Sequence, residues 1–509
     1  MAKRKKGSAK KRVSRKAEAA RSSAAVKLRS PTVNAVGVKH LAEPPTFVRP
    51  KRIHPRRGIP MVAEGDESIV HSDTPEAAFA QPHEMAAPAA PANQNLAVVR
   101  KTFLTALAAK DTAGNVGEPS AAANANVVFY TGNWYAAVST DGGVTFQFID
   151  PAKAFRQFDP PNSHFCCDQV VQFVPQIDTF VWLLQYGPDT GDNIQRLAIA
   201  KTADAAQGRW KLFDITTASL GAKGSFLDFP DLAVGANMLY VTTNVFPAQG
   251  RAGTAVIRIP LSGIASGQIT AQRFVSMDNF SFRVAQNCGT TAFFAAHKDT
   301  STLRVFSWPE TAATPTVKEV GVARYIGGNG YHSRTPDGQR WLDRADPRIT
   351  GATLAGNNVW FAWGVNRGSN NRPKPFVQIA KIDVTNMTLV ENINVFDSQS
   401  ATCYGALGTN ANGEVGISYM IGGGARFPTN VVGILTGARK DVVVAASDRG
   451  PLPAPDSGKG EWGDYLTVRR AFPNQKLFAA TGYALKGAGD GTNQDATPHF
   501  VIFGRASDV

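Results

Sequence analysis

The chain has 509 residues, and its 54 Lys and Arg against 40 Asp and Glu give a formal net charge of +14. Four cysteines are too few for a disulfide scaffold at this length, and no apolar run approaches the roughly 20 residues of a membrane-spanning helix. The length suits two or three ordinary domains or one large ring of β-sheets.

The positive charge is concentrated at the start of the chain. Residues 1–60 hold 18 Lys and Arg and two acids, so the remainder has 36 basic and 38 acidic residues. A nearly neutral body argues against a nucleic-acid-binding face on the main domain. Residues 1–95 lack periodicity and become Pro/Ala-rich, which predicts a disordered basic arm. The arm is either a solubility tail or a tether through which residues 1–60 bind an anionic surface.

The first 30 residues also bear on the compartment, because they carry charge but no apolar segment of the kind found in a secretory signal. We therefore expect a protein that is cytoplasmic or exported by a non-classical route. We also expect it to be a monomer. We expect Cys166, Cys167, Cys288 and Cys403 to be reduced and buried, since the neighbours Cys166 and Cys167 would bridge only with strain.

Residues 126–149 predict a strand, a tight turn, a strand, a Gly-rich turn and another strand. The second turn holds Ser139, Asp141, Gly143, Thr145 and Phe146 in the pattern S-x-D-x-G-x-T-aromatic. Asp141 is placed to accept hydrogen bonds from following backbone N–H groups, and the glycines supply positive φ. We interpret this turn as a structural device, and the alternative is a role of Asp141 in binding carbohydrate or calcium.

From residue 96 one phrase recurs, namely a polar opening, an inner strand, a turn and a very apolar strand. The copies are spaced by roughly 58 residues, enough for four strands with loops. The openings lie at 118–121, 167–170, 229–232, near 283–284, 346–349, 404–407 and 463–466. The apolar strands begin at Val127, Phe180, Leu239, Ala292, Val359, Val415 and Leu477.

These copies predict an all-β fold, a β-propeller of seven four-stranded blades that fills residues 96–509 as one domain. Six blades are the alternative, because the fourth copy is faint. The seventh copy ends after its third strand, and residues 98–104 could supply the fourth. Such pairing of the N- and C-terminal strands would close the ring and remove an exposed edge.

Acidic residues recur at the openings of the inner strands, where a propeller brings them together around its axis. Several carboxylates facing one channel could bind Ca²⁺ through oxygen ligands, or two of them could act as acid and base on a glycosidic bond. Hydrogen bonding between blades is the structural alternative. The metal-site candidates are Glu118, Asp168, Asp231, Asp346 and Asp464, and the catalytic candidates are Asp168, Asp346 and Asp464.

Two long connections combine aromatic and charged residues, as in sites that bind sugars. One spans residues 327–348 and the other residues 447–465. The ligand-binding candidates on these connections are Tyr331, His332, Trp341, Arg344, Arg348, Trp462 and Tyr465.

The Asp141 turn and the repeated phrase resemble the sialidase-like propellers with Asp-box, or BNR, repeats, across about residues 96–506. The stretches 462–465 and 229–244 look like those of uncharacterised bacterial members of that superfamily. The resemblance implies the fold and a link to glycans. It does not carry sialidase activity over, because the Phe/Tyr-Arg-Ile-Pro motif is missing and only one clear Asp-box is present.

The leading hypothesis is a propeller that binds a glycan or another polar ligand at the mouth of its channel or on the two connections, with no chemistry assigned. One alternative is a glycoside hydrolase that uses a carboxylate pair. Another is a protein-docking scaffold tethered by the basic arm. A glycan array would separate the first from the scaffold, and release of reducing sugar would support the hydrolase.

Overall fold

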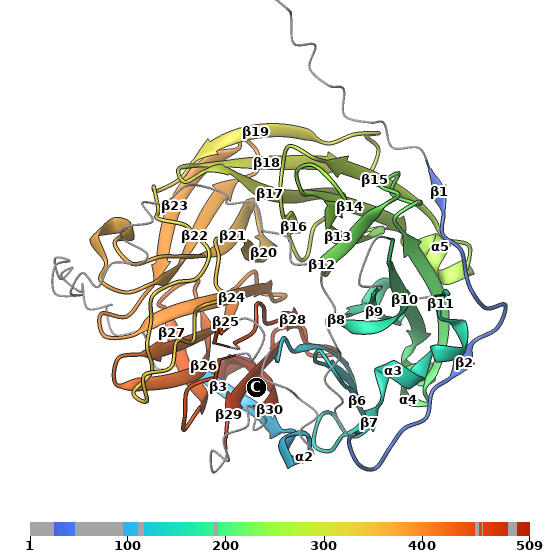
Figure 1. Cartoon of the computed structure of the whole chain (residues 1–509), viewed down its shortest axis with the longest axis horizontal. Helices are drawn as coiled ribbons and strands as arrows, with labels where there is room; N and C mark the ends of the chain where they lie inside the picture. Colours follow the sequence, from blue (N-terminus) through green and yellow to red (C-terminus); the bar gives the residue numbers. More distant parts are fainter. Residues whose placement is uncertain are drawn as a thin grey trace, which may run out of the picture.

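The computed structural model describes residues 25–45, 95–109, 117–161, 163–187, 192–453, 458–460, 462–486 and 496–509. Its strands form seven antiparallel sheets around one axis (Figure 1). The seven-bladed propeller predicted from the repeats is confirmed, and the six-bladed alternative is wrong. In every blade the strand nearest the axis is the one that contains a polar opening or begins at or just after it in the sequence.

Blades 1 to 4 follow one another along the chain, each with its strands in sequence order from the axis outward. Blade 1 comprises β4 (Ser120–Asn124), β5 (Val127–Thr131), β6 (Ala136–Ser139) and β7 (Gln147–Ile149). Blade 2 comprises β8 (His164–Val174), β9 (Thr179–Gly187), β10 (Ile194–Lys201) and β11 (Arg209–Thr216). Blade 3 comprises β12 (Ser225–Val234), β13 (Met238–Pro247), β14 (Gly253–Pro260) and β15 (Thr270–Ser276). Blade 4 comprises β16 (Arg283–Val284), β17 (Thr291–Asp299), β18 (Thr302–Pro309) and β19 (Thr316–Gly321).

Blades 5 to 7 complete the ring. Blade 5 comprises β20 (Ile349–Ala355), β21 (Asn358–Val365), β22 (Phe376–Asp383) and β23 (Thr388–Val395). Blade 6 comprises β24 (Ala401–Thr409), β25 (Val415–Gly423), β26 (Arg426–Ile434) and β27 (Lys440–Ala446). Blade 7 comprises β28 (Val468–Arg470), β29 (Phe478–Leu485), β30 (Ala496–Arg505) and, as its outer strand, β3 (Leu96–Phe103). Short helices α2 (Thr105–Ala109), α3 (Pro151–Ala154), α4 (Thr202–Ala206) and α5 (Leu261–Ser266) lie in the connections.

The core lies between the faces of adjacent blades. The second strands are buried on both faces, and all nine residues of β9 are buried. This explains why these strands read as continuous apolar runs rather than as an alternating pattern. Between blades 1 and 2, Phe129 packs against Trp182 and Trp210 with ring centroids 5.0 and 4.9 Å away. Such aromatic packing adds to the stabilisation from burial alone.

The last blade is built from both ends of the described propeller. β3 pairs antiparallel with β30, and Val98 lies opposite Phe503. Because β30 thereby gains a hydrogen-bonded neighbour on its outer side, strands from before blade 1 and from after blade 6 close the ring within one blade.

Part of the predicted arm is ordered against the propeller. Residues 25–45 run along the outside of the ring (Figure 1), where β1 (Val26–Lys27) pairs with β15 and β2 (Val36–Gly37) pairs with β11. Leu28, Val36 and Val38 are buried there. The prediction of disorder is therefore wrong for this segment, which we call the strap. Its two short strands each add to the outer strand of a blade, and its buried apolar side chains pack against the ring. The rest of residues 1–94 lies outside the described residues.

The turn around Asp141 has the geometry of a closed hydrogen-bonded loop. Its carboxylate accepts from the backbone N–H groups of Val144 and Thr145 at 2.9 Å and from the Thr145 hydroxyl at 2.6 Å. Burial acts to raise the pKa of Asp141, but the hydrogen bonds from Thr145, Ser139 and Val144 outweigh it and lower that pKa well below its usual range. Gly142 and Gly143 take positive φ, and the Phe146 ring packs beside Tyr130 and Phe500.

The cysteines differ in part from the prediction. A disulfide joins Cys166 and Cys167, so the expectation that both are reduced is wrong, whereas Cys288 and Cys403 are free and buried. The pair lies in a β-bulge of β8, between Phe165 and Gln169, where the regular alternation of side chains is interrupted. Among the described residues, no helix is long and apolar enough to cross a membrane.

Candidate functional site

The channel has two mouths. We call the end where the inner strands begin the upper mouth, and the end where they finish the lower mouth. Near the upper mouth β8, β12, β20 and β24 each contain a register shift. Phe229 and Tyr404, inside two of these shifts, take positive φ of 54° and 58°. Bulges re-aim side chains that a regular strand would place on alternate faces, and here they occur where the predicted acids lie.

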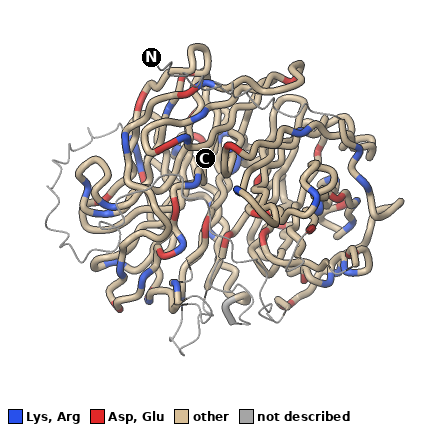
Figure 2. The backbone as a smooth tube through the Cα atoms, turned by 45° about the horizontal axis from the view of Figure 1, so that its top comes forward, with Lys and Arg blue, Asp and Glu red and all other residues tan. Residues whose placement is uncertain are grey.

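Basic and acidic residues are interspersed along the described backbone (Figure 2), and arginines pair with several of the predicted acids at the upper mouth. Arg348 Nε donates to both carboxylate oxygens of Asp346 at 2.9 and 2.8 Å, and its Nη2 lies 3.3 Å from Asp464 Oδ2. Arg344 Nε lies 3.5 Å from Asp464 Oδ1. The structure thus brings Arg344, Arg348, Asp346 and Asp464 together, although three of these residues precede blade 5 and one precedes blade 7.

A second ion-pair group lies between blades 3, 4 and 7. Asp231 Oδ2 accepts from Arg283 Nη1 at 2.8 Å, and its other oxygen lies 3.5 Å from Arg469 Nη2. All three side chains are buried. One carboxylate therefore serves two guanidinium groups.

Phe229 links the two charged groups. Its ring lies beneath the guanidinium carbons of Arg348 and Arg283, at 4.1 and 5.2 Å from the ring centroid, and it meets Tyr465 edge-on at 5.4 Å. Cation–π contacts of this kind stabilise a desolvated arginine. Tyr465 is 3% exposed, and its hydroxyl has no hydrogen-bond partner among the described atoms.

Burial favours the protonated form of two of the predicted acids, Glu118 and Asp168. Burial, followed by the nearby Asp464 carboxylate, raises the pKa of Glu118 to about 7. Burial, followed by the charges of Glu118 and Asp228, raises the pKa of Asp168 well above its usual range. Neighbouring buried carboxyl groups raise one another's pKa because ionising all of them would place like charges close together away from water.

Little space is open beside the paired arginines and acids. The cavity lined by Arg344, Asp346, Arg348, Tyr404 and Asp464 has a volume of about 10 Å³, which is room for about one water molecule. Within the described parts of the chain, no three His, Cys, Asp or Glu side chains are grouped as a metal site. The metal and catalytic candidates are thus near one another around the axis, but mainly in contact with arginines and with the backbone.

The aromatic candidates on the two long connections are packed inside the protein. Trp341 and Trp462 are fully buried and meet edge-on at 6.0 Å, while Trp462 stacks on Tyr483 at 4.6 Å. Tyr331 is also fully buried and donates to the Gly364 carbonyl at 2.8 Å. These rings hold the two connections against each other, so in this conformation they offer no face to a ligand.

His332 and Arg344 are the more accessible candidates on these connections. His332 is half-buried, and the Arg344 side chain is 40% exposed. Residues 454–457 and 461 of the second connection lie outside the described residues.

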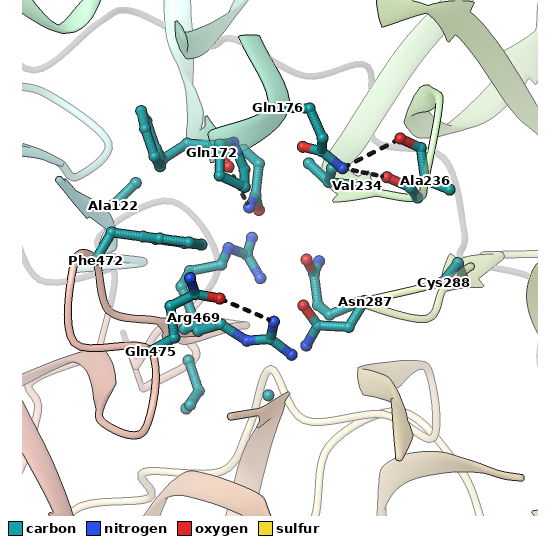
Figure 3. Close-up of a pocket in the computed structure, with 17 residues that line it drawn as sticks. Ala122, Gln172, Gln176, Val234, Ala236, Asn287, Cys288, Arg469, Phe472 and Gln475 are labelled. Carbon is teal, nitrogen blue, oxygen red and sulfur yellow. Dashed lines mark hydrogen bonds between the residues drawn. The ribbon is translucent and has the colours of Figure 1, made fainter. Parts of the chain in front are cut away.

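The lower mouth contains a pocket that sequence reasoning missed. Its volume is about 480 Å³, and it is lined by residues of blades 1, 2, 3, 4, 6 and 7, so it must lie on the axis. Figure 3 shows Gln172, Asn287 and Arg469 extending toward the middle of the pocket, with Phe472 along one side. The polar lining residues are Gln172, Gln176, Gln286, Asn287, Arg469, Arg470 and Gln475.

Hydrogen bonds to the backbone hold most of these side chains. Gln176 Nε2 donates to the Gly235 and Ala236 carbonyls at 2.8 and 3.3 Å (Figure 3). Gln286 Nε2 donates to the Leu232 carbonyl at 2.6 Å, and Asn287 Nδ2 donates to the Thr409 carbonyl at 2.9 Å. Each bond joins two different blades or loops, so the polar groups of the pocket are positioned by the rigid ring.

A signal for this pocket is present in the sequence, although it is weak. Each inner strand ends a few residues after its opening phrase, and the copies at 170–176, 284–287 and 468–475 end in Gln, Asn or Arg. Alignment of the strand ends, rather than of the openings alone, would have placed these residues on one ring.

Comparisons with known proteins give only distant similarities. No known family profile matches the chain, and no curated protein matches it by sequence. A sialidase from Trypanosoma rangeli is similar over 66% of this chain and 54% of its own, with 10% identity and a TM-score of 0.36. The match thus spans about half of that sialidase.

An α-L-arabinofuranosidase from Fusarium graminearum is similar over 75% of this chain and 91% of its own, with 9% identity and a TM-score of 0.35. The WD40 domain of SCAP from fission yeast is similar over 82% of this chain and 99% of its own, with 8% identity and a TM-score of 0.34. TM-scores this low indicate no function for this chain.

Proposed function

We propose that this protein binds a glycan or another small polar ligand in the pocket of the lower mouth. The observation that carries the proposal is the size and lining of that pocket. A volume of about 480 Å³ lies within the roughly 300–1,000 Å³ of small-molecule sites. It is large enough for a short oligosaccharide, whereas the cavity at the upper mouth holds about one water.

The chemistry of the lining fits a hydroxylated ligand. Carboxamides offer both donors and acceptors to hydroxyl groups. Phe173 and Phe472 add an apolar side, with ring centroids 5.2 Å apart. The ligand would meet side chains from six blades at once, on a scaffold whose strands are fixed by packing, so little ordering would be needed on binding.

A glycoside hydrolase remains the second candidate, because one observation favours it. A pKa of about 7 at Glu118 is the value expected of a general acid near neutral pH. Glu118 lies close to Asp464, whose backbone N–H donates to Glu118 Oε1 at 3.1 Å. The hydrolase ranks second because the cavity lined by Asp346 and Asp464 has a volume of about 10 Å³, which is too small for a sugar ring.

The proposal can be tested by blocking the pocket sterically. Ala236 is half-buried on the rim of the pocket (Figure 3), so Ala236→Trp should fill the mouth without changing a charge. Binding of a panel of neutral and acidic oligosaccharides would be measured by titration calorimetry and ligand-observed NMR. We expect a ligand of the wild type to be lost in Ala236→Trp and kept in Ala236→Ser.

Equal binding by wild type and Ala236→Trp would refute the site. Release of reducing sugar by the wild type that is lost in Glu118→Gln, with binding at the lower mouth absent, would favour the hydrolase instead.

A further inference from the structure

We infer that the ligand of the lower mouth is a hydroxylated oxyanion, carrying a carboxylate or a phosphate that Arg469 and Arg470 bind. This inference rests on the proposed function of the pocket. It adds the chemical class of the ligand, which the size of the pocket alone does not determine.

The charged residues that line the pocket favour an anionic ligand. Of the described residues that line the pocket, none is Asp or Glu, whereas consecutive arginines of β28 both reach it. Asp231 is already shared between Arg469 and Arg283 at 3.5 and 2.8 Å. Arg470 bonds to two backbone carbonyls and to the Gln475 amide rather than to a carboxylate, so an anionic ligand in the pocket would offset the positive charge of the two arginines.

One hydrogen-bond donor of Arg469 is unsatisfied in the described part of the structure. Arg469 is 6% exposed, and its Nε has no hydrogen-bond partner among the described atoms. Burial, together with the charge of Arg283, lowers the pKa of Arg469, while Asp231 opposes that change. A buried guanidinium N–H without an acceptor is costly, and an oxyanion in the adjoining pocket would supply the acceptor.

Arg470 is held in place for the same task. Its Nε donates to the Thr409 carbonyl and its Nη2 to the Asn410 carbonyl, both at 3.2 Å, and its Nη1 lies 3.5 Å from Gln475 Oε1. A guanidinium has five N–H donors, so two remain. The three anchored donors fix its plane, and a fixed guanidinium favours the two-point binding of a carboxylate or phosphate.

Gln172 indicates which groups the rest of the ligand carries. Gln172 is 8% exposed, its Nε2 donates to the Phe173 carbonyl at 3.1 Å, and its Oε1 has no partner among the described atoms. Figure 3 shows its amide extending into the pocket. A free acceptor here calls for a donor on the ligand, and a hydroxyl group is the donor that a sugar offers. Sugar acids and sugar phosphates both combine hydroxyls with an oxyanion.

The experiment uses the full chain and three probes: digalacturonate, neutral galactobiose and inorganic phosphate. Affinity is measured by calorimetry at low and moderate salt. We expect a carboxylated or phosphate probe to bind, and Arg469→Gln and Arg470→Gln each to weaken it by roughly tenfold or more. The control is Arg209→Gln, an exposed arginine on the outer strand β11, which should bind as the wild type does.

The outcomes separate the class of ligand from the site itself. Binding of galactobiose as tight as that of digalacturonate, unchanged in both arginine variants but lost in Ala236→Trp, would overturn the oxyanion and keep the pocket. Binding of no probe, or binding that survives Ala236→Trp, would refute both. If phosphate alone binds and depends on Arg470, the source is a phosphate ester rather than a sugar acid. Should Arg469→Gln fail to fold, Arg470→Gln decides the question.

Discussion

Arg283 of blade 4 donates to Asp231 of blade 3 at 2.8 Å, and the two side chains are 6% and 8% exposed. Arg469 of blade 7 reaches the same carboxylate at 3.5 Å. A single acid thus joins three blades around the axis. Loss of one member of such a buried group lowers the stability of the fold strongly, because the remaining charged side chains stay buried without a counter-charge.

We therefore predict that Asp231→Asn lowers the free energy of unfolding by about 3 kcal/mol, because it leaves two buried guanidinium groups without a counter-charge. Denaturant unfolding monitored by tryptophan fluorescence measures this. The control is Asp204→Asn, which breaks an ion pair with Arg209 whose side chains are 39% and 54% exposed, and it should cost less than about 1 kcal/mol. Equal effects of the two substitutions would contradict the role of Asp231.

Glu118 should make stability depend on pH. Burial, and then the Asp464 charge, raises its pKa from 4.5 to about 7 in the folded protein, so the folded state binds more protons than the unfolded state in this interval. The contribution to stability is then full below pH 4.5 and is lost as pH rises toward 7.

We predict that Glu118→Gln, which keeps an acceptor for the Asp464 N–H, is more stable than the wild type at pH 8 by about 2 kcal/mol. The advantage should shrink toward pH 4. Melting temperatures across this pH range measure it, and a difference that does not change with pH would contradict the raised pKa.

The blades were predictable because each repeats one strong signal. A second strand that is buried on both faces is mostly apolar, and this made seven runs visible without any structure. The fourth copy was faint for a physical reason, since β16 has only two residues. Its place was nevertheless marked by Arg283, which begins the strand.

The sites were harder to predict because the sequence pattern shows where side chains converge but not how they are satisfied. The openings of the inner strands do gather acids, but Asp346 and Asp464 meet arginines from the same openings. Trp341 and Trp462 have the composition of a sugar-binding surface and instead pack on each other. The lower pocket draws on six blades, and its Gln, Asn and Arg residues recur at the ends of the inner strands, a weaker signal than the acids at the openings.

The strap should stabilise the propeller through a few apolar contacts. Leu28 is 4% exposed and belongs to the core between blades 2 and 3, whereas Val33 in the same segment is 98% exposed. We predict that Leu28→Asp lowers the free energy of unfolding by about 2 kcal/mol, since it removes a buried leucine and places a charge there. Val33→Asp should have no effect in the same denaturation experiment. A stability loss in Val33→Asp, or none in Leu28→Asp, would show that the strap is not docked in this way.

The strap also sharpens the test of the predicted tether. Removal of residues 1–60 would strip the strap from the ring as well as the basic residues, so a loss of binding would be ambiguous. We predict that deletion of residues 1–24, which keeps the strap, greatly weakens cosedimentation with vesicles that contain acidic lipid, because ten Lys and Arg residues are lost. The melting temperature should not change. Full binding after this deletion would exclude the segment as the tether.

Trp341 and Arg344 allow the loop candidates to be separated by mechanism. Trp341 is fully buried, its Nε1 donates to Ser333 Oγ at 2.8 Å, and its ring meets Trp462. Trp341→Ala should therefore lower the free energy of unfolding by about 4 kcal/mol, and any loss of ligand binding would follow from disorder of the connection.

Arg344, 40% exposed and 3.5 Å from Asp464, should tolerate substitution by Gln with a cost below about 1 kcal/mol. Unfolding curves and ligand affinity are measured for both variants. Recognition by this loop would show as weaker binding in Arg344→Gln at unchanged stability, and recognition confined to the lower mouth predicts that Arg344→Gln binds as the wild type does.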